Sequence, residues 1–428
     1  MSRTQRKRPA LLACPPLSEA LGRKNGFGLL RLVLALSVIF AHAMPLGMGK
    51  HDLGYDQAQG QTNVGAMAVA GFFVLSGLLI TRSGMRLSTG RFMWNRAIRI
   101  LPGLWVCLLV TALVIAPLVA YHQGRLDGFW SHPQGPWSYL KANYGIGVGQ
   151  WGVSGLLDHN PHPTAFNGSV WSLSYEVFCY IAVAALAALG ILHRARWAVA
   201  LLVAGMYAYL VSMAVDFDRL RLPLYAPTDL QGWRFPFLDW LSMEMLLPVG
   251  FMFGLGAVAE LYKKRLPINP VAGVLAFGVV LATAHYGGFT VIGLPAFAYV
   301  LLVLAARMPG PLTKVGTKVD LSYGVYIYAF PIQQCLTLWE VNRHGYAVYT
   351  ALSVALALLA ALCSWFLVEK PALKLKDLGL RRPPKAGPGT AGTAAPAAAP
   401  AGTTAPAPAP LGGVGVTATT AGGVHAAR

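Results

Sequence analysis

The sequence predicts an all-α membrane protein: a polytopic bundle of about ten transmembrane helices with both termini in the cytoplasm. Hydrophobic side chains make up 55% of the 428 residues and charged side chains only 12%, about half the share found in ordinary soluble domains. The apolar residues fall in runs long enough to cross a bilayer. The excess of basic residues, a net charge of +18, lies between those runs and therefore indicates membrane topology first.

Ten runs reach or approach the roughly 20 residues that a transmembrane helix needs. Each is helical by its length, and none shows the alternating pattern of a membrane strand. In chain order the ten runs are Phe27–Gly47, Val64–Thr81, Ile100–Ala120, Ser169–Leu192, Trp197–Val215, Asp239–Tyr262, Pro270–Tyr286, Phe289–Ala306, Asp320–Leu338 and Ala347–Val368.

The distribution of Lys and Arg orients these helices. With the N-terminus inside, the cytoplasmic segments hold 26 of them and the opposite side holds 7, while Arg31 lies within the first helix. This split predicts that two long loops, 122–168 and 216–238, are external. Both are rich in Gly, Pro, Trp and Tyr, and we expect them to fold over the outer mouth of the bundle.

Three parts of the chain differ in composition. Residues 1–26 form a basic cytoplasmic segment, residues 27–376 the membrane domain, and residues 377–428 a low-complexity tail that we expect to be disordered because it cannot bury a core. Residues 41–43 resemble a signal-peptidase site after a basic start. Because Arg31 interrupts the apolar run before that site, we expect the first helix to remain uncleaved, with cleavage as the alternative.

Composition and spacing also exclude some kinds of site. The five cysteines are scattered, without a CxxC pair or metal-ligand spacing, so no disulfide framework and no metal cofactor are expected. The basic residues are interpreted as topology signals at the lipid bilayer rather than as nucleic-acid contacts, so no nucleic-acid partner is expected.

Ionisable residues within apolar runs are candidates for function because the bilayer makes them costly. Arg31 and His42 lie in the first run, and eleven steps of 100° bring both onto one face, about 16.5 Å apart along the helix axis. Taken singly, a snorkelling arginine and a hydrogen-bonded core histidine are ordinary features. Their alignment favours a shared pathway.

Two further clusters carry polar groups. Ser172, Glu176 and Tyr180 follow an i, i+4, i+8 spacing and form one polar stripe. This stripe is compatible both with a hydrogen-bonded clamp between helices and with a catalytic or substrate-binding role. Arg96 and Arg99 form an i, i+3 fork suited to phosphate groups, although the positive-inside rule alone also accounts for them.

Six motifs, in order, resemble the acyltransferase 3 family, integral membrane proteins that O-acylate cell-surface carbohydrates and related acceptors. The resemblance covers about Asn25 to Lys376. The motifs are Arg31 followed by ten residues and His42, then Phe72–Gly77, Arg96–Pro102, Trp171–Glu176, Leu321–Tyr326 and Val368–Pro371.

The resemblance implies a helical bundle of about ten spans and an acyl-CoA donor, usually acetyl-CoA, on the cytoplasmic side. It also implies a catalytic histidine matching His42 and an associated arginine matching Arg31. The chain departs from many relatives at Ala329, where they carry a histidine. If that histidine handles the acceptor, this chain handles it differently, with Tyr326 or Tyr328 as candidates.

The residues and the resemblance converge on one mechanism. Arg31, Arg96 and Arg99 are expected to hold the CoA phosphates. His42 is expected to act as a base on the acceptor hydroxyl or to carry the acyl group, and Glu176 to orient His42 or the acceptor. The motif side chains expected to support the substrates are Ser76, Trp171, Ser172, Tyr175, Tyr323 and Tyr326.

Several alternatives remain open at this stage. A secondary transporter would use buried Arg, His and Glu as relay or substrate residues, and a scaffold of a polysaccharide-assembly complex would use them as structural contacts. For an enzyme, the carbohydrate acceptor ranges from lipopolysaccharide and other polysaccharides to an oligosaccharide or a macrolide. The expected location is a bacterial cytoplasmic membrane.

Overall fold

A computed structural model describes residues 14–22, 24–225, 234–235 and 238–377. Helices dominate the described residues, as the sequence predicts, and the expected tail after Asp377 and basic cluster before Cys14 lie outside them. Within these described residues, eight helical stretches are long and apolar enough to cross a membrane. They are Phe27–Met48, Val64–Gly84, Thr89–His122, Trp171–Ala188, Arg196–Val215, Met243–Leu261, Phe289–Arg307 and Tyr346–Lys376.

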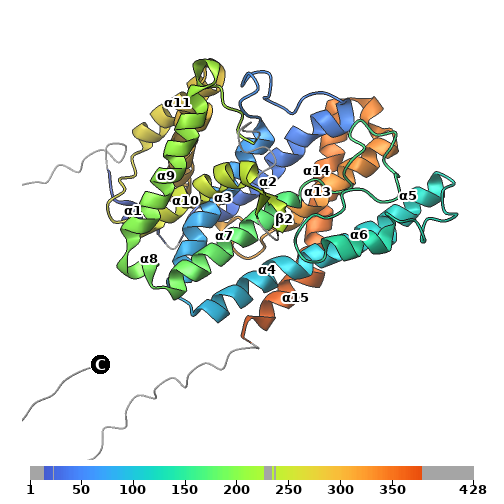
Figure 1. The fold of residues 1–428 in the computed structure, drawn as a ribbon, viewed down its shortest axis with the longest axis horizontal. Helices are drawn as coiled ribbons and strands as arrows, with labels where there is room; N and C mark the ends of the chain where they lie inside the picture. The colour runs from blue at the N-terminus through green and yellow to red at the C-terminus, as the bar shows by residue number, and fades with distance from the viewer. Residues whose placement is uncertain (1–13, 23, 226–233, 236–237, 378–428) are drawn as a thin grey trace, which may run out of the picture. The chain divides into compact units, whose positions relative to one another are not determined.

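Some of these stretches combine α-helices with π-helical turns. The α-helices within the eight stretches are α2 (Phe27–Ala43), α3 (Val64–Gly84), α4 (Thr89–Val110), α5 (Ala116–His122), α7 (Trp171–Ala188), α9 (Arg196–Val215), α10 (Met243–Leu261), α12 (Leu294–Arg307), α14 (Tyr346–Ser364) and α15 (Lys370–Leu373). The remaining α-helices are α1 (Leu17–Ala20), α6 (Pro136–Asn143), α8 (Ile191–Arg194), α11 (Pro270–Tyr286) and α13 (Ser322–Leu338). Figure 1 shows their arrangement.

All ten predicted runs are occupied by helix, since α11 and α13, of 17 residues each, fill the two ranges without a full-length span. Two boundaries were predicted wrongly. The third run was expected to begin at Ile100, but α4 begins at Thr89, because a helix can continue through the charged residues that end an apolar run. The sixth run was expected to begin at Asp239, but a short antiparallel pair, β1 (Arg234–Phe235) and β2 (Leu238–Ser242), precedes it, and α10 begins at Met243. Hydropathy misses this change because a strand and a helix can be equally apolar.

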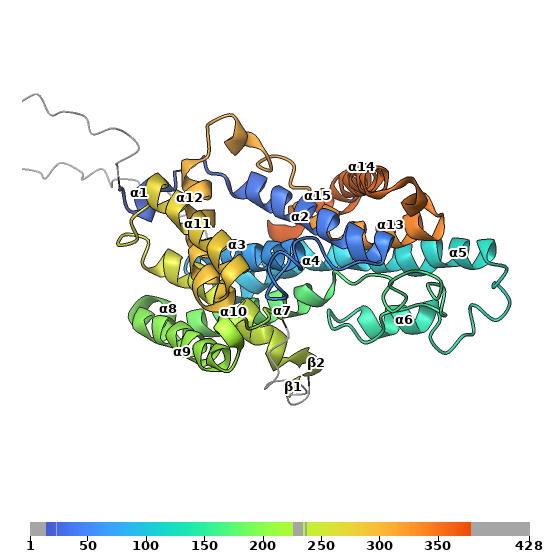
Figure 2. The same cartoon turned by 90° about the horizontal axis from the view of Figure 1, so that it is seen from above.

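The centre of the helical unit is the crossing of α3 and α10, which lie side by side in both views (Figures 1 and 2). Glycines permit this crossing. A Cβ atom at Gly77 would lie 1.9 Å from the carbonyl oxygen of Phe253, and one at Gly256 would lie 2.0 Å from that of Val74. Each helix thus presents a glycine to the backbone of the other, which lets the two helix axes approach closely. Ser76, next to Gly77 on α3, donates a hydrogen bond to Glu176 of α7.

Helices from the two ends of the membrane domain pack together, with α13 and α14 against α2 (Figure 2). Ala35 and Ile39 of α2 share one apolar cluster with Val325 and Ala329 of α13. The side chain of Ala329 is 2% exposed and is enclosed in this cluster. The position where many relatives were expected to carry a histidine is therefore a helix-packing position in this chain.

The long loop 122–168 has internal structure that hydropathy did not predict, including α6. Its end is fixed to α13 by one buried amide, Gln334. The Nε2 atom of Gln334 donates to the carbonyl oxygens of His162 and Ala165, at 2.8 and 2.7 Å, and its Oε1 accepts from Asn160 at 2.7 Å. These bonds hold residues 160–165 close to the last turn of α2.

Candidate functional site

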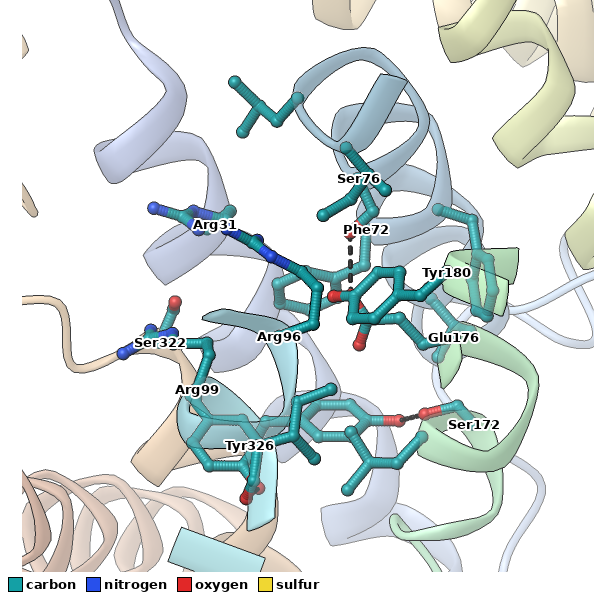
Figure 3. A pocket seen from close by; sticks show the side chains of 17 residues that line it. Arg31, Phe72, Ser76, Arg96, Arg99, Ser172, Glu176, Tyr180, Ser322 and Tyr326 are labelled. Atoms are coloured by element: carbon teal, nitrogen blue, oxygen red, sulfur yellow. Dashed lines mark hydrogen bonds between the residues drawn. The ribbon is translucent and has the colours of Figure 1, made fainter. Parts of the chain in front are cut away.

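One polar pocket, named here the arginine pocket, lies among α2, α3, α4, α7 and α13 and has a volume of about 120 Å³. Its polar side chains come from segments far apart in the sequence, and Figure 3 shows them surrounding a common space. The polar residues lining it are Arg31, Ser76, Arg96, Arg99, Ser172, Glu176, Tyr180, Ser322, Tyr323 and Tyr326.

The three arginines of this pocket differ in their partners. Arg31 and Arg99 contact the same oxygen of Asp320, at 3.0 and 2.8 Å, and Arg99 also contacts Glu369 at 3.2 Å. Arg96 forms no ion pair with a carboxylate in the described part of the chain, and its Nε is buried without a hydrogen-bond partner. Arg96 is therefore the arginine that can bind an anion without first losing an ion pair.

The polar stripe of α7 faces the arginine pocket. Glu176 accepts hydrogen bonds from Ser76, at 2.9 Å, and from Tyr180, at 2.5 Å. Ser172 and Tyr326 are joined by a hydrogen bond of 2.6 Å between their hydroxyl oxygens, drawn as a dashed line in Figure 3. The stripe thus clamps α7 to α3 and α13, and it also presents a carboxylate and hydroxyl groups to the pocket.

A second pocket, named here the histidine pocket, lies at the other end of α2 and has a volume of about 520 Å³. His42 lines it together with the π-helical turn that follows α2, the loop 151–168 and α13. The ring of His42 lies edge-on to Phe330, with 5.5 Å between the ring centroids. The residues lining the pocket are His42, Pro45, Leu46, Asp52, Trp151, His162, Thr164, Ala165, Gly168 and Phe330.

His42 has a carboxylate partner in this pocket. Its Nδ1 lies 3.3 Å from Oδ1 of Asp52, and both side chains are a little under one-third exposed. Because a carboxylate can only accept, Nδ1 carries the proton in the neutral imidazole and the lone pair lies on Nε2. This tautomer leaves Nε2 able to take a proton from a bound group.

A second histidine, His162, lines the same pocket. Partial burial lowers the pKa of His162, and the nearby His42 lowers it further, while Asp52 acts in the opposite direction. The backbone carbonyl of His162 accepts a hydrogen bond from Gln334, and its ring lies edge-on to Phe330 with 6.1 Å between the ring centroids. The neutral form of His162 is therefore favoured in the folded protein.

The two pockets share helices but are separated by a layer of side chains. On α13, Tyr326 lines the arginine pocket and Phe330, one turn further along, lines the histidine pocket. The rings of Phe72 and Tyr326 meet edge-on at 5.7 Å, beside the bond from Tyr326 to Ser172. A ligand reaching from one pocket to the other has to pass this layer.

The structure brings most of the predicted site residues together, but not all. Eight of them line the arginine pocket and His42 lines the histidine pocket. Trp171 and Tyr175 line neither pocket. Trp171 packs edge-on against Tyr175 and Tyr225, and the hydroxyl of Tyr175 contacts Ser242, so both side chains brace the segment before α10.

Sequence reasoning missed several charged and aromatic members of the site. The partners of Arg31, Arg99 and His42 were not predicted, nor were the loop residues of the histidine pocket. The missed residues are Asp52, Trp151, His162, Asp320 and Glu369. Glu369 lies within a motif quoted above, and Asp320 directly precedes another, so these two had a local signal. Among the described residues, no group of three or more His, Cys, Asp or Glu could hold a metal ion.

Apolar spanning helices around two polar pockets, one of them with a histidine–carboxylate pair, define an integral membrane protein with the components of an acid–base site. A family model described as an acyltransferase domain matches residues 24–369. The chain belongs to this family, the acyltransferase 3 family, and is a membrane O-acyltransferase, as its motifs predict.

Two characterised relatives match nearly their whole length. An O-acetyl transferase of Shigella phage Sf6 is 28% identical over 357 residues, covering 81% of this chain and 96% of the relative. Nodulation protein 10 of Rhizobium leguminosarum bv. viciae is 28% identical over 399 residues, covering 85% of this chain and 96% of the relative. No solved structure matches the chain significantly.

Proposed function

We propose that the protein transfers an acyl group, in the first place acetyl, from acyl-CoA to a hydroxyl group of a cell-surface or exported carbohydrate. The observation that carries this proposal is the placement of two polar pockets at the two ends of α2, with Arg31 in one and His42 in the other. A donor and an acceptor that approach from opposite sides of a membrane need such an arrangement.

The donor binds in the arginine pocket in this proposal. CoA carries several phosphate groups on a nucleotide and a long, thin arm that ends in the thioester. Arg96, which has no carboxylate partner among the described residues, binds a phosphate, and Arg31 and Arg99 contribute charge while remaining anchored to Asp320. The arm extends past Tyr326 and Phe72 toward His42.

The chemistry takes place at His42. Nε2 removes the proton of the acceptor hydroxyl, and the oxygen attacks the carbonyl carbon of the thioester. A carbon–oxygen bond forms, the carbon–sulfur bond breaks, and the imidazolium returns its proton to the departing CoA thiolate. Asp52 holds Nδ1–H and stabilises the imidazolium, which makes it a positioning residue for this step. Glu176 stays with Ser76 and Tyr180, within the donor pocket.

The acceptor enters through the histidine pocket. Trp151 lines that pocket and its side chain is 42% exposed, which suits stacking on a sugar ring, while Thr164 and His162 offer polar contacts. The name of the phage relative, O-acetyl transferase, supports acetyl transfer to oxygen. A bacterial cytoplasmic membrane is the proposed location because it separates CoA from surface carbohydrates.

Radiolabelled acetyl-CoA tests this function. Membranes containing the protein are incubated with acetyl-labelled acetyl-CoA and with cell-surface carbohydrate from the host, and the label on the carbohydrate is counted. The proposal predicts base-labile label that requires His42, because oxygen esters are cleaved by mild alkali. Uptake of intact acetyl-CoA without acetylation of the carbohydrate would indicate a transporter. If acetyl-CoA were neither taken up nor consumed, the result would indicate a scaffold.

A further inference from the structure

A third pocket, named here the basic pocket, lies away from the two pockets of the proposed reaction and has a volume of about 600 Å³. Its lining residues come from the ends of α3 and α10 and from the segment where α8 leads into α9. Figures 1 and 2 show α8 at an edge of the helical unit. The residues lining the basic pocket are Met85, His193, Arg194, Arg196, Trp197, Glu260, Leu261, Tyr262, Lys263, Lys264 and Arg265.

The basic pocket carries a strong surplus of positive charge. It contains five Lys and Arg side chains but a single carboxylate, Glu260, which is 1% exposed. Glu260 is already occupied, because Lys263 contacts its Oε1 at 2.6 Å and Arg82 contacts its Oε2 at 2.8 Å. The other four cations form no ion pair with any described carboxylate. These cations are Arg194, Arg196, Lys264 and Arg265.

The positive-inside rule requires basic residues on this face, which the charge distribution predicts to be cytoplasmic, but it does not require a cavity among them. Here cations from two segments about 70 residues apart surround one space. The four cations without a carboxylate partner are exposed, so water and salt screen much of their mutual repulsion, and an anion bound in the pocket would lower it further. Phosphate groups are the anions that such Arg and Lys clusters recognise.

The apolar surface beside the pocket indicates which phosphate compound fits. Trp197 lines the pocket at the start of α9 and is 63% exposed, as expected of a tryptophan at the membrane interface. Leu201 and Leu202, one turn further along α9, are 61% and 59% exposed. A ligand with phosphate at the cations therefore has an apolar helix face directly beside it, where acyl chains can lie.

We propose that the basic pocket binds the phosphate headgroup of an anionic phospholipid of the cytoplasmic leaflet, with its acyl chains along α9. Basic pockets between transmembrane helices on the cytoplasmic side are suited to such headgroups. A soluble phosphate compound shares the phosphate chemistry but makes no use of Trp197 or the exposed leucines. The lipid would tie α9 to α10 at the membrane surface. This assignment is independent of the reaction proposed for the other two pockets.

Native mass spectrometry of the full-length protein in detergent tests this assignment. The parent is titrated with phosphatidylglycerol and, separately, with phosphatidylcholine that has the same acyl chains. The same titrations are then repeated on the double variant Lys264→Gln/Arg265→Gln. At roughly 1 kcal/mol per cation near the surface, the variant should bind phosphatidylglycerol about 25-fold more weakly. Lys314→Gln/Lys318→Gln removes the same charge from another loop of the same predicted face and should leave binding within about twofold.

The assignment is overturned by equal weakening in both double variants, by equal binding of the two lipids to the parent, or by displacement of the lipid with excess inorganic phosphate or 3′,5′-ADP. Displacement would indicate a soluble phosphate ligand. Should Lys264→Gln/Arg265→Gln not fold, Arg194→Gln/Arg196→Gln reports on the opposite wall of the pocket. The parent alone gives a second readout, since phosphatidylglycerol should raise its thermal unfolding midpoint more than phosphatidylcholine does.

Discussion

The imidazole of His42 and the carboxylate of Asp52 lie 3.3 Å apart, although one ends a transmembrane helix and the other lies in the loop that follows it. The contact fixes the proton on Nδ1 and leaves Nε2 as the basic nitrogen. In the proposed reaction Nε2 removes the proton from the hydroxyl group of the carbohydrate. The contact between His42 and Asp52 therefore connects the fold of the loop with the proposed chemistry.

Replacing either member of this pair should reduce acyl transfer. His42→Ala should lower the rate by roughly 10²–10⁴-fold, the usual contribution of a general base, while leaving CoA binding intact. Asp52→Asn keeps a hydrogen-bond acceptor but removes the charge that stabilises the imidazolium, so its loss should be smaller and should appear in kcat rather than in KM for the donor.

A neighbouring histidine–aspartate contact provides the matched control. Asp56 contacts Nδ1 of His51 at 2.9 Å, and both side chains are largely exposed. Asp56→Asn should therefore leave turnover unchanged. Equal losses in Asp52→Asn and Asp56→Asn would show that the loop needs its charges only for folding.

Substitutions of Arg96 and Arg99 in the arginine pocket should have different effects, because only Arg99 forms ion pairs with described carboxylates. Arg96→Ala should weaken CoA binding by about 10- to 100-fold, the value of a lost hydrogen bond to a charged group, with little effect on thermal unfolding. Arg99→Ala also strips Asp320 and Glu369 of a cation, so it should cost roughly 3 kcal/mol of stability as well. Isothermal titration with CoA and thermal unfolding measure the two effects, and an Arg96 variant with parental affinity for CoA would remove that residue from the donor site.

The depressed pKa of His162 gives a pH dependence of stability. Its folded-state pKa lies below the unfolded value of about 6.5, so the unfolded chain binds the proton more readily. The corresponding stability is present above that unfolded value and is lost as the pH falls through the lower, folded-state pKa. His162→Gln should therefore lose less thermal stability than the parent between about pH 7 and pH 5.

His159 provides the comparison for this experiment, since it is exposed in the same loop. His159→Gln should follow the acid destabilisation of the parent. Identical curves for the parent and both variants would mean that protonation of His162 is not coupled to folding.

The crossing of α3 and α10 should not tolerate a side chain at its glycines. Gly77→Ala places a methyl group against the backbone of Phe253 and should cost about 1–3 kcal/mol, measured as a lower thermal unfolding midpoint. Gly205 of α9 has open space around its Cβ position, so Gly205→Ala should be neutral or stabilising. Equal effects of the two changes would contradict the crossing as described.

Labelling of introduced cysteines should test the membrane orientation. Ser131 and Ser88 are exposed serines on opposite predicted sides, so each can be replaced by cysteine with little change in volume. In a background lacking the exposed Cys14 and Cys363, Ser131→Cys should react with an impermeant maleimide in intact cells and Ser88→Cys should not. The reverse pattern would place the two pockets on the wrong sides for the proposed reaction.

Much of the fold and part of the site can be predicted from the sequence, for physical reasons. Apolar runs of sufficient length must be helices in a bilayer, and the 100° turn per residue places Arg31 and His42 on one stripe before any tertiary structure is known. The same periodicity predicts the Ser172 and Glu176 stripe. These relationships are local to one helix, and the structure retains both.

The contacts between segments could not be predicted in this way. Arg96 and Arg99 look equivalent in the sequence. Only the packing of α4 against the residues before α13 and after α14 gives Arg99 two carboxylate partners, whereas Arg96 has none among the described residues. Asp52 and His162 lie in loops without periodicity, so no sequence pattern connects them to His42. The resemblance marks Ala329 only as a departure from a family histidine. Its packing role depends on its neighbours in α2 and α14, which the sequence alone does not identify.

The proposed transfer from a cytoplasmic donor to an acceptor on the other side of the membrane is tested most directly by measuring acyl transfer across a sealed membrane. Everted vesicles, which expose the predicted cytoplasmic face, and right-side-out vesicles are given acetyl-labelled acetyl-CoA from outside, with carbohydrate acceptor on the opposite side. The proposed mechanism predicts labelled carbohydrate inside the everted vesicles, formed at least about 10²-fold more slowly in His42→Ala, and none in right-side-out vesicles. Labelling in right-side-out vesicles alone, or transfer that persists at the parental rate without His42, would contradict it.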